Sequence, residues 1–334
     1  CKRLGERIGV RRLYVKDETR NPTGSFKDRP MTVGVSMARE FAATAITVAS
    51  SGNAGAAASV YAAAASITCV ILAPATTPRE KVVQAAISGA KVVLVDGTYS
   101  DSFRLASDAV DKYGWMNVTS TFVNPYTTEG DKTVAYEMCQ QLGGEVPDWI
   151  IVPVGAGPLL VGIWKGFNEL RNLGYVSVLP KMVGVQAEGC APIARAYLHG
   201  SEKVQPWSHP TTVASAIADP LQGYAQDGTR TLNTIRRSKG LAEQCTDGDI
   251  VQAVKELASH EGLFTEPAAA APYAALKTMV ARGTVDANDL VVMIATGHGL
   301  KDPDAAARLV ETPAIIFPKV ETLDKVLAEK GILP

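Results

Sequence analysis

The regular alternation of short apolar segments with longer helical patterns constrains the fold of this chain more than any other feature. The apolar segments are rich in β-branched residues and lack a polar–apolar alternation, as is typical of strands covered on both faces. The expected strands are residues 13–16, 45–49, 67–73, 91–95, 149–153, 181–186 and 290–295. The expected helices are residues 27–43, 53–66, 78–88, 99–112, 129–141, 159–172, 247–259 and 267–281. This order predicts mostly parallel sheets with helices on both faces.

The length of 334 residues predicts two domains rather than one core. We expect two three-layer α/β/α domains that share a cleft. The proposed division places a smaller, inserted domain at residues 37–133 and a larger domain at residues 1–36 and 134–334. Residues 199–230 are rich in Pro, Ser, Thr and Gly and are expected to be irregular.

Composition excludes several classes of function. Lys and Arg number 33 and Asp and Glu 34, so the formal net charge of −1 gives no electrostatic reason to expect a nucleic-acid or membrane partner. The apolar run at residues 54–65 is too short for a membrane span. The five cysteines are scattered, without a CxxC motif or a His at ligand spacing. We therefore expect reduced thiols in a cytoplasmic protein, with no disulfide framework and no metal site.

A lysine is delivered to the start of a helix by residues 21–29, Asn-Pro-Thr-Gly-Ser-Phe-Lys-Asp-Arg. The helix macrodipole opposes positive charge at an N-terminus and so favours the neutral amine of Lys27. A neutral amine is the form that reacts with a carbonyl compound to give an imine. The alternative is an exposed lysine that merely follows a loop.

Two further turns follow strands and open helices with small residues. Residues 50–55, Ser-Ser-Gly-Asn-Ala-Gly, can bring backbone N–H groups close to an anion such as a carboxylate, and Asn53 can offer its amide to a phenolic oxygen. Residues 152–159, Val-Pro-Val-Gly-Ala-Gly-Pro-Leu, have the form of a phosphate cradle. They are not a dinucleotide motif, because the third glycine is missing. An ordinary helix cap and a tight packing turn are the alternatives.

The last motif, residues 294–303, reads Ile-Ala-Thr-Gly-His-Gly-Leu-Lys-Asp-Pro and overlaps the end of an expected strand. Thr296 is expected at the carboxyl end of that strand, where open α/β sheets place ligands. His298 has the chemistry of a general base, but we expect it to shape the turn.

Together, in this order, the motifs resemble those of the fold-type II enzymes that use pyridoxal 5′-phosphate (PLP). Within that family the chain is most similar to the threonine synthases. The similarity runs through residues 16–18 (Lys-Asp-Glu), 21–29, 124–126 (Asn-Pro-Tyr), 129–133 (Glu-Gly-Asp-Lys-Thr), 261–267 (Glu-Gly-Leu-Phe-Thr-Glu-Pro) and 297–303 (Gly-His-Gly-Leu-Lys-Asp-Pro). The resemblance implies PLP in the cleft between the domains, a small phosphorylated amino acid as substrate, and a homodimer.

The resemblance also implies roles for individual residues. Lys27 is the catalytic residue, which would bind PLP as an imine and carry protons. The other cofactor contacts would be Asn53 at the 3′-oxygen, Thr296 at the ring nitrogen, and the backbone N–H groups of Gly155, Ala156, Gly157 and Leu159 at the phosphate. Pro158 lies inside that turn and has no N–H to donate. The implied substrate contacts are Ser50, Ser51, Asn53, Ala54, Thr127 and Lys132.

The implied reaction is γ-elimination of phosphate from O-phosphohomoserine, followed by addition of water at the β carbon to give threonine. The chain departs from the usual pattern at Thr127, where much of the family has an arginine that can bind the substrate's phosphate, and at Thr121, Phe122 and Ala54. Lys132 can compensate in part as a point charge.

These departures leave alternative functions open. One is a related lyase, either a serine or threonine dehydratase or a β-replacement enzyme, such as a cysteate synthase, that acts on O-phosphoserine. Another is a PLP-fold protein that serves as a binding or regulatory module. The presence of Lys27, Asn53 and Thr296 argues against the binding module.

Overall fold

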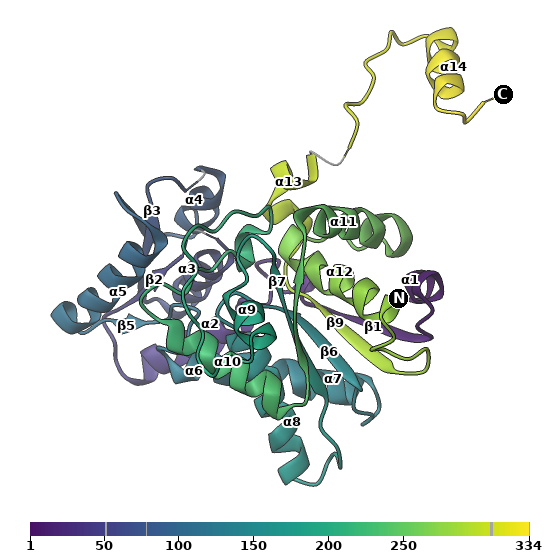
Figure 1. The fold of residues 1–334 in the computed structure, drawn as a ribbon. Helices are drawn as coiled ribbons and strands as arrows, with labels where there is room; N and C mark the ends of the chain where they lie inside the picture. Colours follow the sequence, from purple (N-terminus) through teal and green to yellow (C-terminus); the bar gives the residue numbers. More distant parts are fainter. Residues whose placement is uncertain (51, 78, 308–309, 334) are drawn as a thin grey trace.

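Two separate parallel sheets organise the computed structural model, which describes residues 1–50, 52–77, 79–307 and 310–333 (Figure 1). The larger sheet has the strand order β1 (Arg12–Asp17), β9 (Leu290–Ala295), β6 (Trp149–Pro153), β7 (Lys181–Ala187) and β8 (Leu241–Cys245). The smaller sheet has the order β4 (Lys91–Val95), β3 (Thr68–Pro74), β2 (Ala45–Ala49) and β5 (Met116–Asn117). The ladders that join these strands are parallel.

Helices follow the strands along most of the chain. The α-helices are α1 (Lys2–Ile8), α2 (Asp28–Glu40), α3 (Asn53–Ala65), α4 (Arg79–Ala86), α5 (Tyr99–Tyr113), α6 (Pro125–Asp131), α7 (Thr133–Gln141), α8 (Pro158–Asn172), α9 (Pro192–Leu198), α10 (Ala225–Arg237), α11 (Asp247–Glu261), α12 (Pro267–Ala281), α13 (Pro303–Ala307) and α14 (Val320–Glu329). The 3-10 helices are η1 (Glu18–Arg20), η2 (Ser215–Ile217) and η3 (Gly299–Lys301). Figure 1 shows α14 apart from the two sheets and the helices that cover them.

Both sheets are covered on both faces, which confirms the predicted three-layer architecture. Successive residues of a strand point to opposite faces, and β6 shows the consequence. Ile150 and Val152 belong to a core with α7, α8 and α10, whereas Ile151 belongs to a core with α11 and α12. In the smaller sheet, β2 packs in the same way against α2 and α3 on one face and against α5 on the other.

The structure differs from the sequence prediction in one predicted helix, in the predicted irregular stretch and in several short elements. The predicted helix at residues 129–141 is two helices, α6 and α7, which meet at Lys132. The predicted irregular stretch 199–230 already contains the start of α10, whose apolar contacts come from a few residues such as Leu232 and Ile235 among many polar ones. The edge strands β5 and β8 and the helices α1, α9, α13 and α14 were not predicted, because short or partly exposed segments lack a continuous apolar run.

The strands of the smaller sheet all lie between residues 45 and 117. They fall inside the proposed inserted domain, but α2 crosses its first boundary at residue 37 and packs against both α3 and α6. The division at residues 37 and 133 therefore stays a prediction. No helix among the described residues is long and apolar enough to cross a membrane.

Helices α2 and α6 approach each other closely at Gly130, and a substitution there tests their packing. A Cβ atom at Gly130 would lie 2.2 Å from the carbonyl oxygen of Arg29 and 2.7 Å from Cα of Pro30. We expect Gly130→Ala to lower the free energy of unfolding by about 1–3 kcal/mol, because one backbone must move. Urea denaturation measures the change. The matched control is Gly248→Ala in α11, where the nearest atom would lie 3.7 Å away and where stability should not fall. Equal stability of the two variants would contradict the contact.

Candidate active site

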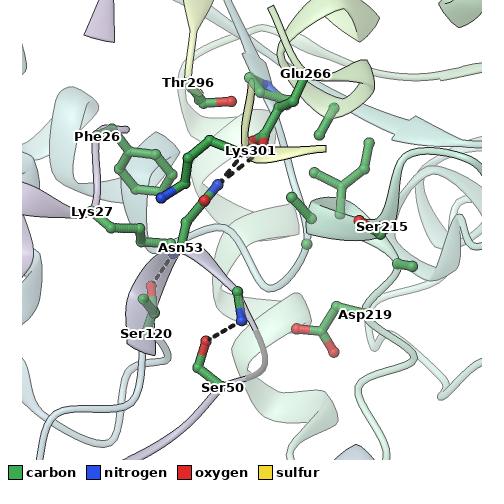
Figure 2. Close-up of a pocket in the computed structure, with 18 of the residues that line it drawn as sticks. Phe26, Lys27, Ser50, Asn53, Ser120, Ser215, Asp219, Glu266, Thr296 and Lys301 are labelled. Atoms are coloured by element: carbon green, nitrogen blue, oxygen red, sulfur yellow. Dashed lines mark hydrogen bonds between the residues drawn. The ribbon is translucent and has the colours of Figure 1, made fainter. Parts of the chain in front are cut away.

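A cavity of about 360 Å³ lies where the carboxyl ends of strands from both sheets meet. Its wall includes Ala49 from β2, Pro153 from β6 and Thr296, which directly follows β9. The starts of α3 and α8 and the segment around η2 also line the cavity, and Figure 2 shows Asn53 of α3 and Ser215 of η2 there. This volume suits a small-molecule ligand, and strand carboxyl ends are the usual site for one in open α/β sheets.

Lys27 stands on this wall directly before α2 begins. Its Nζ donates to Oγ of Ser120 and lies 4.3 Å from the centroid of the Phe26 ring. Burial lowers the pKa of Lys27 to about 8, although the carboxyl groups of Asp131 and Glu266, and that of Asp219 when it is ionised, oppose the shift. The amine is therefore neutral much more often near neutral pH than an ordinary lysine amine would be.

A network of charged and polar groups fixes the turn that carries Lys27. Arg29 donates through Nε and Nη2 to both carboxylate oxygens of Glu18, at 2.6 and 2.8 Å, and also to Glu137. Glu18 is 1% exposed, and this bidentate contact pairs its buried carboxylate oxygens with the guanidinium group. Asp28 accepts from the backbone N–H and the hydroxyl of Thr23, both at 3.0 Å. Helix α2 and its preceding turn are thereby held on either side of the lysine.

The Lys27 turn is also joined to the turn that follows β9. The N–H of Phe26 donates to the carbonyl oxygen of Thr296 at 2.9 Å, and Ser25 pairs with Gly297 in an antiparallel bridge. Thr296 is 4% exposed and lines the cavity. His298 shapes the same turn, since its Nδ1 accepts from the N–H of Leu300 at 3.1 Å.

Asn53, at the start of α3, meets a residue that the sequence prediction missed. The Asn53 side-chain amide donates to both carboxylate oxygens of Glu266, at 3.0 and 3.1 Å (Figure 2). Glu266 is 5% exposed and lines the cavity immediately before α12. A Cβ atom at Gly297 would lie 2.4 Å from its Oε1, so the glycine leaves room for the carboxylate. The only sequence signal for Glu266 is its place in the family-like motif at residues 261–267.

The turn before α8 has the geometry of an anion cradle. Gly157 has a φ of +100°, and a Cβ atom there would lie 2.3 Å from Oγ1 of Thr231. The Thr231 hydroxyl donates to the carbonyl oxygen of Ala156 at 2.6 Å and holds the turn open. The first N–H groups of a helix have no acceptor within it, and so this turn fits a phosphate group. Gly155, Ala156, Gly157 and Leu159 all line the cavity.

The predicted substrate-binding residues do not all come together. Ser50 and Ala54 line the cavity, and Ser51 lies outside the described residues. Thr127 is 1% exposed, donates its hydroxyl to the carbonyl oxygen of Asn124 at 2.8 Å, and is not part of the cavity wall. Lys132 is also absent from the wall and forms ion pairs with Glu129 and Glu169. Their part in substrate binding stays a prediction.

Cysteines and groups of potential metal ligands lie elsewhere or are not found among the described residues. All five cysteines are free thiols, and none lines the wall. Within the part of the chain that the structure describes, no group of three or more His, Cys, Asp or Glu side chains gathers as metal ligands.

Comparisons with known proteins agree with this geometry. A family model described as "Pyridoxal-phosphate dependent enzyme" matches residues 1–297. The threonine synthase of Methanocaldococcus jannaschii is 41% identical over 330 residues, which cover 98% of this chain and 80% of that protein. The threonine synthase of Methanosarcina acetivorans is also 41% identical, over 99% of this chain and 81% of its own length.

Solved structures share the fold at lower identity. An L-serine ammonia-lyase from Rhizomucor miehei has a TM-score of 0.78 at 18% identity and covers 93% of this chain and 96% of its own. The processed form of threonine deaminase isoform 2 from Solanum lycopersicum has a TM-score of 0.76 at 22% identity, and the match covers 93% of this chain and 86% of that one. At these identities the likeness supports the fold alone.

The lowered pKa of Lys27 predicts how its amine reacts with pH. In the cofactor-free protein, acylation of Lys27 by a small reagent should rise with pH and level off above about 8, since only the neutral amine reacts. The acylation of exposed lysines, which have a pKa of roughly 10.4, should still increase with pH above 8 and provides the internal reference. Competitive labelling followed by peptide mass spectrometry measures both. A Lys27 profile that follows the exposed lysines would contradict the effect of burial.

Proposed function

Because the chain belongs to the family of pyridoxal-phosphate-dependent enzymes, and within it to the threonine synthases, we propose that it makes threonine and inorganic phosphate from O-phosphohomoserine and water. The observation that carries the proposal is Lys27 on the wall of a cavity that also includes the glycine turn before α8, whose geometry suits a phosphate group. The same family resemblance extends the proposal to a homodimer.

The cofactor fits the residues of this cavity. The N–H groups of the turn at residues 155–159 would hold its phosphate, the Asn53 amide would bind its phenolic oxygen, and Thr296 would face its ring nitrogen. When bound, PLP supplies an electron sink that stabilises negative charge on the carbon atoms of an amino acid. Thr296 brings a hydroxyl, which does not force the ring nitrogen to stay protonated as a carboxylate would. This favours elimination and replacement over transamination.

Lys27 has the properties that a proton carrier in this reaction needs. Its pKa of about 8 lies close to neutral pH, where a group can both accept and release protons readily. Ser120, which accepts a hydrogen bond from Nζ, gives the amine a fixed direction. The N-terminus of α3, with Ser50, Asn53 and Ala54 on the wall, offers N–H groups to the substrate's carboxylate.

A phosphate leaving group on the substrate would need a cationic side chain on the cavity wall. Among the described residues of the wall, these are Lys27 and Lys301. Lys301 donates to the carbonyl oxygen of Thr23 at 3.0 Å and to Oε1 of Gln84 at 2.7 Å, which leaves one of its three N–H donors for an anion. Because Thr127 and Lys132 lie off the wall, a lyase that acts on O-phosphoserine or on an unphosphorylated amino acid is the second candidate.

Product analysis of one variant and one control tests the proposal. We expect wild type to release phosphate and threonine from O-phosphohomoserine, and Lys27→Ala to lose at least about a thousandfold in turnover, since the variant lacks its proton carrier. The matched control is Lys165→Ala, which removes a half-exposed lysine of α8 that pairs with Glu129 and Glu169 away from the wall. It should retain normal turnover.

The same assay, run with O-phosphoserine and with threonine, separates the second candidate. Turnover of O-phosphoserine without turnover of O-phosphohomoserine would indicate a β-replacement enzyme. Formation of a keto acid from threonine, with no threonine made, would indicate a dehydratase. Substantial turnover by Lys27→Ala would contradict the proposed role of the lysine altogether.

A further inference from the structure

A carboxyl group stands on the cavity wall directly against the predicted phosphate cradle. Asp219 lies just after η2 and lines the cavity (Figure 2). A Cβ atom at Gly155, the first glycine of the cradle, would lie 3.2 Å from Cβ of Asp219 and 3.6 Å from its Oδ2. A phosphate group bound at this turn would therefore have the Asp219 carboxyl as a neighbour.

The orientation of this carboxyl group is fixed from behind. Its Oδ1 accepts from the hydroxyl of Tyr224 at 2.6 Å and from the N–H of Leu221 at 3.0 Å. Tyr224 is 2% exposed, and its ring packs against Phe103 with 4.6 Å between the centroids. Among the described residues, Oδ2 has no hydrogen-bond partner. The oxygen left without a partner is thus the one beside Gly155.

The surroundings of Asp219 favour its neutral form. Burial raises the pKa of its carboxyl, and the nearby Asp227 raises it further, whereas Lys27 and the hydrogen bonds to Oδ1 lower it. The other titratable groups around it are Tyr99, Tyr224 and Cys190, and burial raises the pKa of each, which keeps them neutral. A phosphate dianion bound at the cradle would add a further negative charge and strengthen the preference for the acid.

The cradle itself has room for another donor. Pro158 opens α8 and has no N–H, so the turn offers one donor fewer than its length suggests. An ionised carboxylate beside a phosphate would repel it, whereas a carboxylic acid can donate its O–H. With Oδ1 occupied as an acceptor, the proton belongs on Oδ2.

We infer that Asp219 is a binding residue for the cofactor's phosphate and donates a hydrogen bond to it from Oδ2 as a neutral carboxylic acid. The inference rests on the cofactor of the proposed function but not on its substrate. Asp219 thereby supplies the donor that Pro158 lacks, from a segment about sixty residues away in the sequence.

Two ligands that cannot react with Lys27 isolate this contact. They are 4′-deoxypyridoxine 5′-phosphate and 4′-deoxypyridoxine, which differ only in the phosphate. Their dissociation constants are measured by calorimetry on the 334-residue chain freed of cofactor, for wild type, Asp219→Asn and Asp219→Leu. The asparagine keeps a donor that does not titrate, and the leucine keeps the approximate size without a donor.

We expect Asp219→Leu to bind the phosphorylated ligand about tenfold more weakly and the unphosphorylated ligand as wild type does. The dissociation constant of the phosphorylated ligand for Asp219→Asn should stay within about threefold of the wild-type value near neutral pH. Because burial raises the pKa of Asp219, its proton is lost only as pH rises. Wild type should then lose affinity for the phosphorylated ligand relative to Asp219→Asn, since the carboxylate repels the phosphate. The ionisation of the ligand itself affects both proteins equally.

Three results would overturn the inference. The first is that Asp219→Leu binds the phosphorylated ligand as tightly as wild type or more tightly. The second is that Asp219→Asn loses the same affinity for both ligands. The third is that the ratio of the dissociation constants of wild type and Asp219→Asn does not change with pH. If Asp219→Leu does not fold, the pH comparison of the other two proteins still decides. No substrate enters these assays, so a failure to make threonine would leave their outcome intact and would refute only the proposed reaction.

Discussion

The burial of one lysine amine is the constraint on which the rest of the site depends. An ammonium group loses free energy of hydration when it leaves water, so burial of Lys27 shifts its amine toward the neutral form. The opposing carboxyl groups of Asp131 and Glu266 keep that shift moderate. A lysine with a pKa of about 8 can serve both as a nucleophile and as a proton carrier near neutral pH.

The fold holds this lysine by connecting turns from distant parts of the chain. The Lys27 turn is hydrogen-bonded to the turn after β9. The turn after β9 also pairs with the segment directly before α12, through a bridge between Thr265 and His298. Glycines make the close approach possible. A Cβ atom at Gly299 would lie 2.3 Å from the Phe264 ring, just as one at Gly297 would meet Glu266. The small residues of these motifs are thus a steric requirement of bringing three turns to one cavity.

The sequence predicted most of the fold because most strands are continuous apolar runs, and β2, β4 and β6 have the predicted bounds. The prediction failed where that signal weakens. β8 has the sequence Leu-Ala-Glu-Gln-Cys at a sheet edge, and α10 is mostly polar. At the site, local motifs indicated Lys27, Asn53 and Thr296. Glu266 appeared only as a member of the motif at residues 261–267, and its contact with Asn53 could not be predicted, since the two residues lie 213 positions apart. No motif indicated Asp219.

Attachment of the cofactor to Lys27 is the central claim, and reduction with borohydride tests it most directly. Treatment of the PLP-loaded enzyme fixes the cofactor to the amine that holds it, and peptide mass spectrometry then identifies that amine. A pyridoxyl label on Lys27, in the peptide that spans residues 21–29, is the expected result. A label on Lys301, the other lysine of the described cavity wall, or no label at all, would contradict the assignment.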